Sequence, residues 1–231
     1  DSYFEMLWMI GLSLPLDYIE HHPFHLTGKD VPFLYSLPDK RGTTRPNDVV
    51  ITPRQSVQTA AKLAAPSDSA PDFAVIIDGV QIFRPVIFHG YPTTSQALQG
   101  PVLFVGQATP DFSKIQESQR GGDLSFSGYF FWTPRLVPHE HNGLLIRING
   151  ASGTLFDPSF LKYQVGERRL EHVMAEVYVR TGLEGALNID RESFNTAHPH
   201  YQVLANWVHN SLRLIRSTLK GLQATDSSLS K

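Results

Sequence analysis

The sequence predicts an α+β fold, a mixed β-sheet with helices packed on one side. Strand-like runs fill the middle of the chain, and residues 173–180 alternate between two sets of side chains with the period of a strand. A long amphipathic helix follows at 199–222. Strands followed by a helix and a return strand are typical of a sheet covered by helices on one face.

The first third of the chain is expected to contain short elements separated by loops. Phe4, Leu7, Trp8 and Gly11 have helical spacing, and Gly11 with Pro15 ends this helix at about residue 12. Prolines make 21–46 mostly loop. The other elements expected here are short strands at 15–20, 33–37 and 49–51 and an Ala-rich helix at 56–65.

The middle of the chain is expected to form the sheet. Asp78-Gly79 between the apolar runs 73–77 and 80–88 is the strongest hairpin signal in the chain. Further strands are expected at 101–105, 124–132 and 144–148. Of the aromatic residues 129–132, at least two are expected in the core.

The last third is expected to add a short helical segment around Phe160, a half-buried strand at 173–180 and the long helix. Pro199 suits the first turn of that helix. Its apolar face is formed by Leu204, Trp207, Val208, Ser211, Leu212, Ile215, Leu219 and Leu222.

Composition limits the function classes. With 231 residues, 41% of them hydrophobic, the chain can bury a sizeable core. A net charge of −2 and a pI near 6.6 argue against general attraction to nucleic acid or to an anionic membrane. No apolar run approaches the roughly 20 residues that span a bilayer. Cysteine is absent, which suits a reducing compartment, so a cytoplasmic location is expected.

The loop at 182–194 is the most informative segment for function. It places Asn188, Arg191 and Glu192 between a strand and the long helix, and a loop fixed at both ends can present a charged side chain to a partner. Spacing alone leaves open a surface arginine that pairs with Glu192 or Glu184.

This loop resembles one in the middle domain of the ninety-kilodalton heat-shock chaperones. There a leucine-asparagine-x-x-arginine-glutamate segment follows a strand and precedes a helix, and Leu187, Asn188, Arg191 and Glu192 stand at those places. Residues 143–150 and 128–135 are similar to two earlier strands of the family. In order and spacing the resemblance covers about residues 122–222.

The resemblance implies a ribosomal-S5-like transducer domain at 122–223, after an N-terminal α/β region with a hairpin insertion at 1–121 and before a flexible tail at 224–231. It implies that Arg191 reaches, in trans, the phosphate of ATP held by an N-terminal ATPase domain, supported by Asn188 and Glu192. ATP and magnesium then belong to the parent protein, because this chain lacks the family's ATP-binding motifs. The chain starts at Asp1 without a methionine, which suggests a fragment, a trimmed chain or a processed product. The resemblance implies a fragment of an ATPase. The expected partners are the ATPase domain and a client or partner protein, and a homodimer is left open.

The sequence is also compatible with three other kinds of function. A stand-alone α+β interaction module would use the aromatic strand and the basic residues Arg213, Arg216 and Lys220 as its contact surface. The pair His139 and His141 could chelate a metal if both lay on one strand. The residue types of a serine hydrolase exist as Ser127, His139 and Asp157, without a nucleophile-elbow motif.

Overall fold

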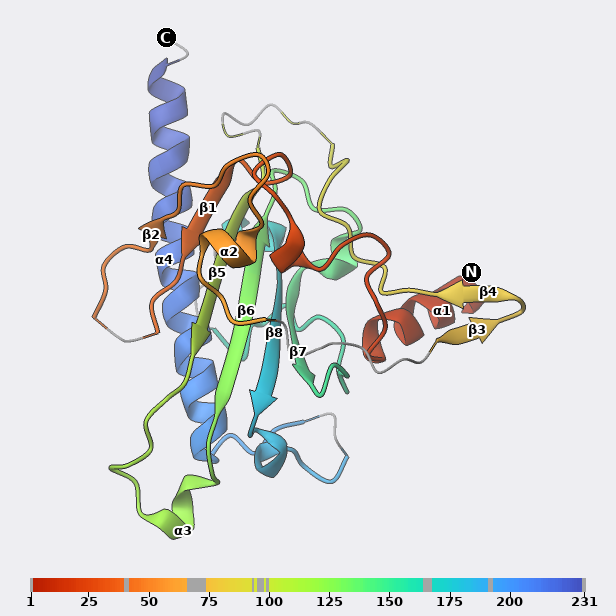
Figure 1. Ribbon diagram of the computed structural model, residues 1–231, viewed down its shortest axis with the longest axis vertical. Coiled ribbons are helices and arrows are strands. Elements are labelled where there is room, and N and C mark those ends of the chain that lie inside the picture. Colours follow the sequence, from red (N-terminus) through yellow and green to blue (C-terminus); the bar gives the residue numbers. More distant parts are fainter. Residues whose placement is uncertain are drawn as a thin grey trace.

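The central feature of the fold is one mixed six-stranded sheet with the order β2-β1-β5-β6-β8-β7 (Figure 1). The computed structural model describes residues 2–39, 42–65, 74–92, 94, 98, 100–163, 168–190 and 193–229. Strands β1 and β5 are parallel, as are β7 and β8, and the other neighbours are antiparallel. The predicted α+β class with a mixed sheet is confirmed.

The elements follow one another in this order: α1 Ser2–Ser13, η1 Pro23–His25, β1 Phe33–Ser36, β2 Asn47–Asp48, α2 Val57–Ala60, β3 Val75–Ile77, β4 Val80–Ile82, β5 Val102–Ala108, α3 Glu117–Arg120, β6 Ser125–Trp132, η2 His139–His141, β7 Gly143–Ile148, η3 Arg168–His172, β8 Val173–Thr181, η4 Glu184–Ala186 and α4 Pro199–Leu229. Here η marks a 3-10 helix.

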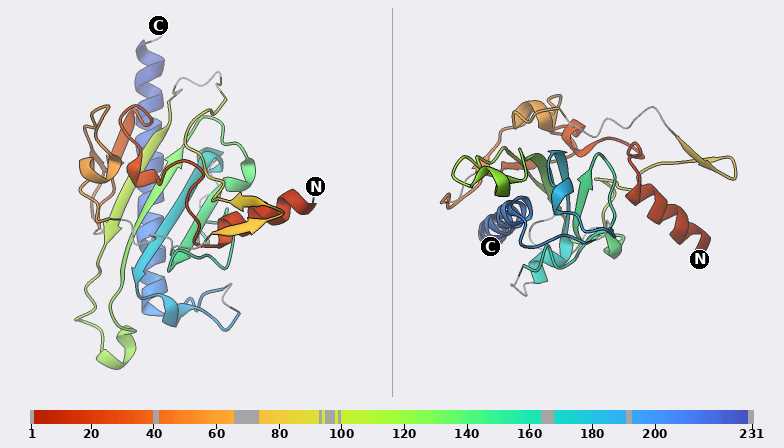
Figure 2. Two further views of the ribbon diagram at one scale, coloured as in Figure 1. Left: turned by 45° about the vertical axis from the view of Figure 1, so that its right-hand side comes forward. Right: turned by 90° about the horizontal axis from the view of Figure 1, so that it is seen from below.

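The two faces of the sheet bury two different apolar cores. Helix α4 covers one face, while η1, α2 and the loops around them cover the other (Figure 2, right). The alternation along β6 separates the two cores, because Phe130 and Trp132 pack on the α4 side and Tyr129 and Phe131 on the opposite side. All four aromatic side chains are therefore buried, and the sheet has no open aromatic face.

Helix α4 begins at Pro199, as predicted. Proline is tolerated in the first turn because its missing N–H has no partner there in any helix. The predicted stripe packs on the sheet, with Leu204, Trp207 and Leu212 among its buried members. The helix continues to Leu229, so the tail predicted at 224–231 begins inside it.

Strand β8 differs from the prediction. Its residues from Val173 to Val179 are buried on both faces, although their alternation indicated a half-buried strand. The difference arises because β8 lies between β6 and β7 and both faces of the sheet are covered.

Other predicted elements are wrong in type or position. The segment after Asp157 is a turn in which Phe160, Leu161 and Lys162 all have positive φ, so it is not a right-handed helix. The strand expected at 49–51 lies at Asn47–Asp48, and the segment 15–20 contributes only an isolated bridge between Tyr18 and Arg84. The predicted division at residue 121 stays a prediction, and the sheet contains strands from both sides of it.

The predicted hairpin is confirmed as β3 and β4, joined by Asp78 and Gly79, which both have positive φ. Helix α1 packs against this hairpin. A Cβ on Gly11 would lie 2.6 Å from the backbone oxygen of Phe83, so only glycine allows this approach. Helix and hairpin together project from the side of the sheet (Figures 1 and 2).

Candidate functional site

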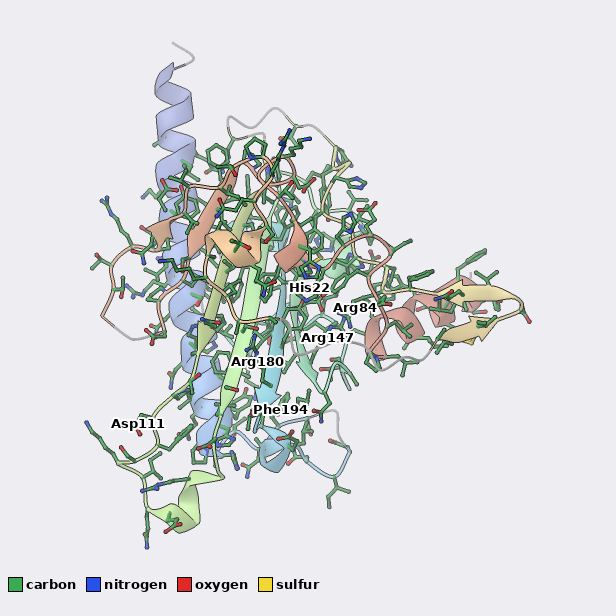
Figure 3. All side chains as sticks on the ribbon, in the orientation of Figure 1. His22, Arg84, Asp111, Arg147, Arg180 and Phe194 are labelled. Carbon is green, nitrogen blue, oxygen red and sulfur yellow. The ribbon has the colours of Figure 1, made fainter. Side chains whose placement is uncertain are left out.

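The loop between β8 and α4 is closed at its base like a small hairpin. Leu187 and Phe194 form an antiparallel bridge, and Phe194 is labelled in Figure 3. The backbone N–H of Asn188 donates to the oxygen of Ser193 over 2.9 Å, and that of Asn195 donates to Ala186 over 2.8 Å. Asn188 and Ser193 therefore close the loop, and Ile189 and Asp190 are the described residues of its tip.

Side chains brace this tip from within. Asn188 Nδ2 donates to Ser193 Oγ at 2.9 Å, and Ser193 Oγ donates to Asp190 Oδ2 at 2.8 Å. Ile189 is fully exposed, with a relative accessibility of 103%. Arg191 and Glu192 lie outside the described residues, between two positions that hydrogen bonds hold.

His200 joins the start of the loop to α4. Its side chain is buried, its Nδ1 accepts the N–H of Leu183 at 3.1 Å, and its Nε2 lies 3.1 Å from the oxygen of Gly122. These contacts define the tautomer, because an accepting Nδ1 leaves the proton on Nε2, where it can be donated to the carbonyl. The turn before β6 and the turn after β8 are thus both fastened to the first turn of the helix.

Gly182 makes this close packing possible. It has a φ of +82°, and a Cβ there would lie 2.3 Å from the oxygen of Asp123. Leu183 follows in the left-handed region as well, with a φ of 72°. The path of the chain into the loop therefore depends on a residue without a side chain.

A hollow of about 730 Å³ lies beside the loop. Its walls are the end of β7, the turn at 149–154 and the loop residues Leu187, Asn188, Ile189 and Phe194. Among the described residues that line it, Glu184 is the one charged side chain. The described residues of the lining offer hydrogen-bonding groups and no cation.

A buried ionic network holds the strand beside this hollow. Arg147 Nε donates to Glu176 Oε2 at 2.5 Å, and Tyr129 donates to Glu176 Oε1 at 2.9 Å. Arg147 Nη1 also donates to the backbone oxygens of Leu12, at 2.8 Å, and Gly150, at 3.3 Å. The end of α1 and the turn that lines the hollow are thereby tied to the sheet through Arg147, which is labelled in Figure 3.

Electrostatics keeps this network charged. Burial alone raises the pKa of Glu176, but Arg147, Arg84 and the hydrogen bonds from Arg147 and Tyr129 outweigh burial, so the pKa is lowered. Burial and the nearby carboxylate raise the pKa of Tyr129, which therefore stays a donor. The guanidinium of Arg84 lies 4.3 Å above the ring of Tyr18. Arg147 and Glu176 are fully buried, so this network supports the fold and meets no substrate.

The pair His139 and His141, which could chelate a metal only from one strand, lies in η2. His141 is buried, stacks on Trp8 with ring centroids 5.7 Å apart, and accepts the indole N–H at 3.2 Å. Burial lowers the pKa of His141 to about 4, against a smaller opposing effect of Glu176 and Glu140. His139 is exposed, and the described residues contain no group of three or more potential metal ligands.

The serine-hydrolase alternative lacks an accessible nucleophile. Ser127 is fully buried within β6, and the carboxylate of Asp157 accepts the backbone N–H groups of Ser159 and Leu161. A buried hydroxyl cannot attack a substrate. On α4, Arg213 and Lys220 are exposed and Arg216 is half-buried.

Sequence reasoning located the loop but missed what supports it. Arg147 in β7 and Glu176 in β8 are single charges inside apolar strands, and this pattern is the signal that could have revealed a buried pair. His200 carried no such signal, because its partners are far away in the sequence.

The fold and the loop define a class: an α+β protein whose mixed sheet and long C-terminal helix hold a projecting loop. Within the described part of the chain, no helix has both the length and the apolarity to cross a membrane. Comparisons of the chain with family models, with curated proteins and with solved structures find no match.

Proposed function

We propose that this protein is the transducing middle part of an ATPase resembling the ninety-kilodalton heat-shock chaperones. In this proposal an N-terminal ATPase domain holds ATP and magnesium, and Arg191 contacts the phosphate from the loop tip. The contact couples ATP binding and hydrolysis to a conformational change and to the binding of a client or partner protein. A cytoplasmic chaperone role is part of the proposal.

The main support for this proposal is the way hydrogen bonds close the loop between β8 and α4. In the sequence Arg191 stands between Asn188 and Ser193, which are hydrogen-bonded to each other, and the described residue Ile189 between them is fully exposed. A guanidinium at such a tip offers two parallel donors and a permanent charge, as phosphate recognition requires. The phosphates, the metal and the carboxylate that orients water would come from the ATPase domain.

The attachment of the loop supports a transducing role. The chain runs from the loop back into β8 on one side and forward into α4 on the other. The contacts of His200 also fasten the first turn of α4 to the turns next to β6 and β8. A contact that differs between ATP and ADP shifts the population between docked and open states only if the loop moves with its domain. A loop fastened to the sheet and to the long helix meets this requirement.

The test is ATP hydrolysis by the protein linked to its ATPase domain. Replacing Arg191→Ala should lower kcat by about 10²-fold or more, the usual cost of removing one transition-state donor. Arg191→Lys should recover part of it, because the charge returns without the bidentate geometry. Lys220→Ala, which removes an exposed cation on α4, is the matched control and should leave turnover unchanged.

Unchanged turnover in the Arg191→Ala variant would remove this residue from the mechanism. A native protein without an ATPase domain, shown by its intact mass and N-terminal sequence, would remove the whole proposal. The second candidate, a stand-alone interaction module, would then remain. Exposed apolar side chains on α1 and the β3–β4 hairpin favour it, whereas the buried aromatic strand β6 cannot serve as its surface.

A further inference from the structure

Helix α1 and the β3–β4 hairpin form a projecting unit, which we call the arm (Figure 2). Helix α1 is apolar nearly all round, and of its residues only Gly11 and Leu12 are buried. A helix of this composition is normally covered on all sides. Its large exposed side chains are Tyr3, Phe4, Met6 and Met9, and the hairpin and the residue after it add Ile76, Val80 and Phe83.

The area of this apolar surface is close to what one side of a stable interface buries. Phe4 is 74% exposed, Ile76 65% and Val80 59%. If a large side chain presents about 200 Å² when fully exposed, the arm leaves on the order of 700 Å² of apolar surface in water. A stable interface buries about 800 Å² per partner.

The charges of the arm favour a protein over a lipid surface. Residues 2–13 and 74–83 contain no Lys or Arg, and their acidic residues are Glu5 and Asp78. Asp78 already accepts a hydrogen bond from Tyr3 at 2.7 Å. Anionic membranes attract helices that carry basic residues, whereas contacts between identical subunits are rich in apolar residues and poor in charge.

The hairpin also has an open backbone edge. Its sheet has two strands, and no described strand pairs with the outer side of β3. In a two-residue hairpin the pair next to the turn, Ile77 and Val80, exchanges backbone hydrogen bonds, so Ile76 and Gln81 direct theirs outward. The N–H and C=O of Ile76 therefore face the open edge, in a strand made of β-branched residues.

We propose that the arm is a homodimer contact in which β3 of one copy pairs antiparallel with β3 of a second copy. The twofold axis passes beside Ile76, so the two Ile76 residues exchange both of their outward hydrogen bonds. Because this axis is perpendicular to the sheet, both α1 helices lie on the same face of a four-stranded sheet. This contact is independent of the ATPase proposal.

Cysteine cross-linking tests this geometry directly, because the chain contains no cysteine of its own. In a hydrogen-bonded antiparallel pair the two Cα atoms are about 5.5 Å apart, within the range that a disulfide spans. The single variant Ile76→Cys, treated with diamide as the oxidant of the two thiols, should form a covalent dimer in high yield. Ile189→Cys, at an even more exposed isoleucine of the loop between β8 and α4, should give only the low yield of random collisions.

Sedimentation equilibrium from nanomolar to high micromolar concentration supplies the second measurement. The unaltered chain should approach twice its monomer mass, and Ile76→Lys, which places two like charges at the axis, should weaken association at least tenfold. Ile189→Lys should leave the mass unchanged. A monomer at every concentration, or equal cross-linking of the two cysteine variants, would overturn the proposal and assign the arm to a different partner.

Discussion

The Nε atom of Arg147 lies 2.5 Å from Oε2 of Glu176, and both side chains are completely buried. The pair joins β7 to β8, and its remaining hydrogen bonds reach Tyr129, Leu12 and Gly150. A buried pair of this kind holds distant segments in one arrangement, because either charge alone would be costly at this position.

We expect Arg147→Met to lower the free energy of unfolding by about 3–5 kcal/mol, since it leaves the Glu176 carboxylate buried without its main partner. The double variant Arg147→Met with Glu176→Leu should recover part of this loss, because the carboxylate is no longer buried without Arg147, while the buried Arg84 loses the attraction of that carboxylate. Urea denaturation of both variants measures the difference. A double variant less stable than the single one would contradict this account.

We expect His141 to make the stability of the fold depend on pH. Its pKa falls from 6.5 to about 4 on folding, mainly through burial, so the unfolded chain binds a proton more readily than the folded one. Its stabilising contribution is complete above pH 6.5 and is lost as pH falls from there to about 4. At about 1.36 kcal/mol per pKa unit, the full loss is on the order of 3 kcal/mol.

The variant His141→Phe keeps an aromatic ring between Trp8 and Phe156 but cannot be protonated. Its free energy of unfolding should therefore change less between pH 6.5 and 4 than that of the unaltered chain. Changing the exposed His21→Phe is the control and should keep the original slope. Equal slopes for all three proteins would show that His141 does not titrate on unfolding. The carboxyl of Glu176, whose pKa is lowered below 4.5 on folding, loses its contribution only at lower pH.

Replacing glycine by alanine should have opposite effects on stability at two positions. Gly182→Ala should destabilise the protein by about 2–4 kcal/mol, because its backbone is left-handed and the new Cβ would meet the oxygen of Asp123. Gly221→Ala should stabilise it by about 0.5–1 kcal/mol, because that glycine lies within α4 and a Cβ there meets nothing within 4 Å. Thermal unfolding of the pair checks both signs, and a neutral Gly182→Ala would mean that the loop entry can relax.

Local signals made part of this fold predictable. The stripe from Leu204 to Leu222 follows from the helical period, and the β3–β4 hairpin follows from Asp78-Gly79, whose residues adopt the positive φ that its turn requires. In both cases the information lies within a few neighbouring residues.

Burial of the sheet was not predictable in the same way. The alternation along β8 shows two faces but not what covers each of them, and Glu176 on one face looked like a solvent-facing residue. It is buried because Arg147, from another strand, pairs with it. Similarly, the position of the loop followed from the strand and helix beside it, whereas the His200 contacts and the hollow depend on segments remote in sequence.

The side chain of Asn188 is exposed, yet its Nδ2 donates a hydrogen bond to Ser193 Oγ at 2.9 Å. Asn188→Ala should change the free energy of unfolding by less than about 1 kcal/mol, the usual net value of an exposed hydrogen bond. Under the proposed function, ATP turnover by the protein linked to an ATPase domain should nevertheless fall several-fold, because a less firmly held loop would bring Arg191 to the phosphate less often. Asn206→Ala, at an exposed asparagine of α4, is the control for turnover. If the two asparagine variants hydrolyse ATP equally fast, bracing of the tip contributes nothing to turnover, and Arg191 would have to be positioned by the partner domain alone.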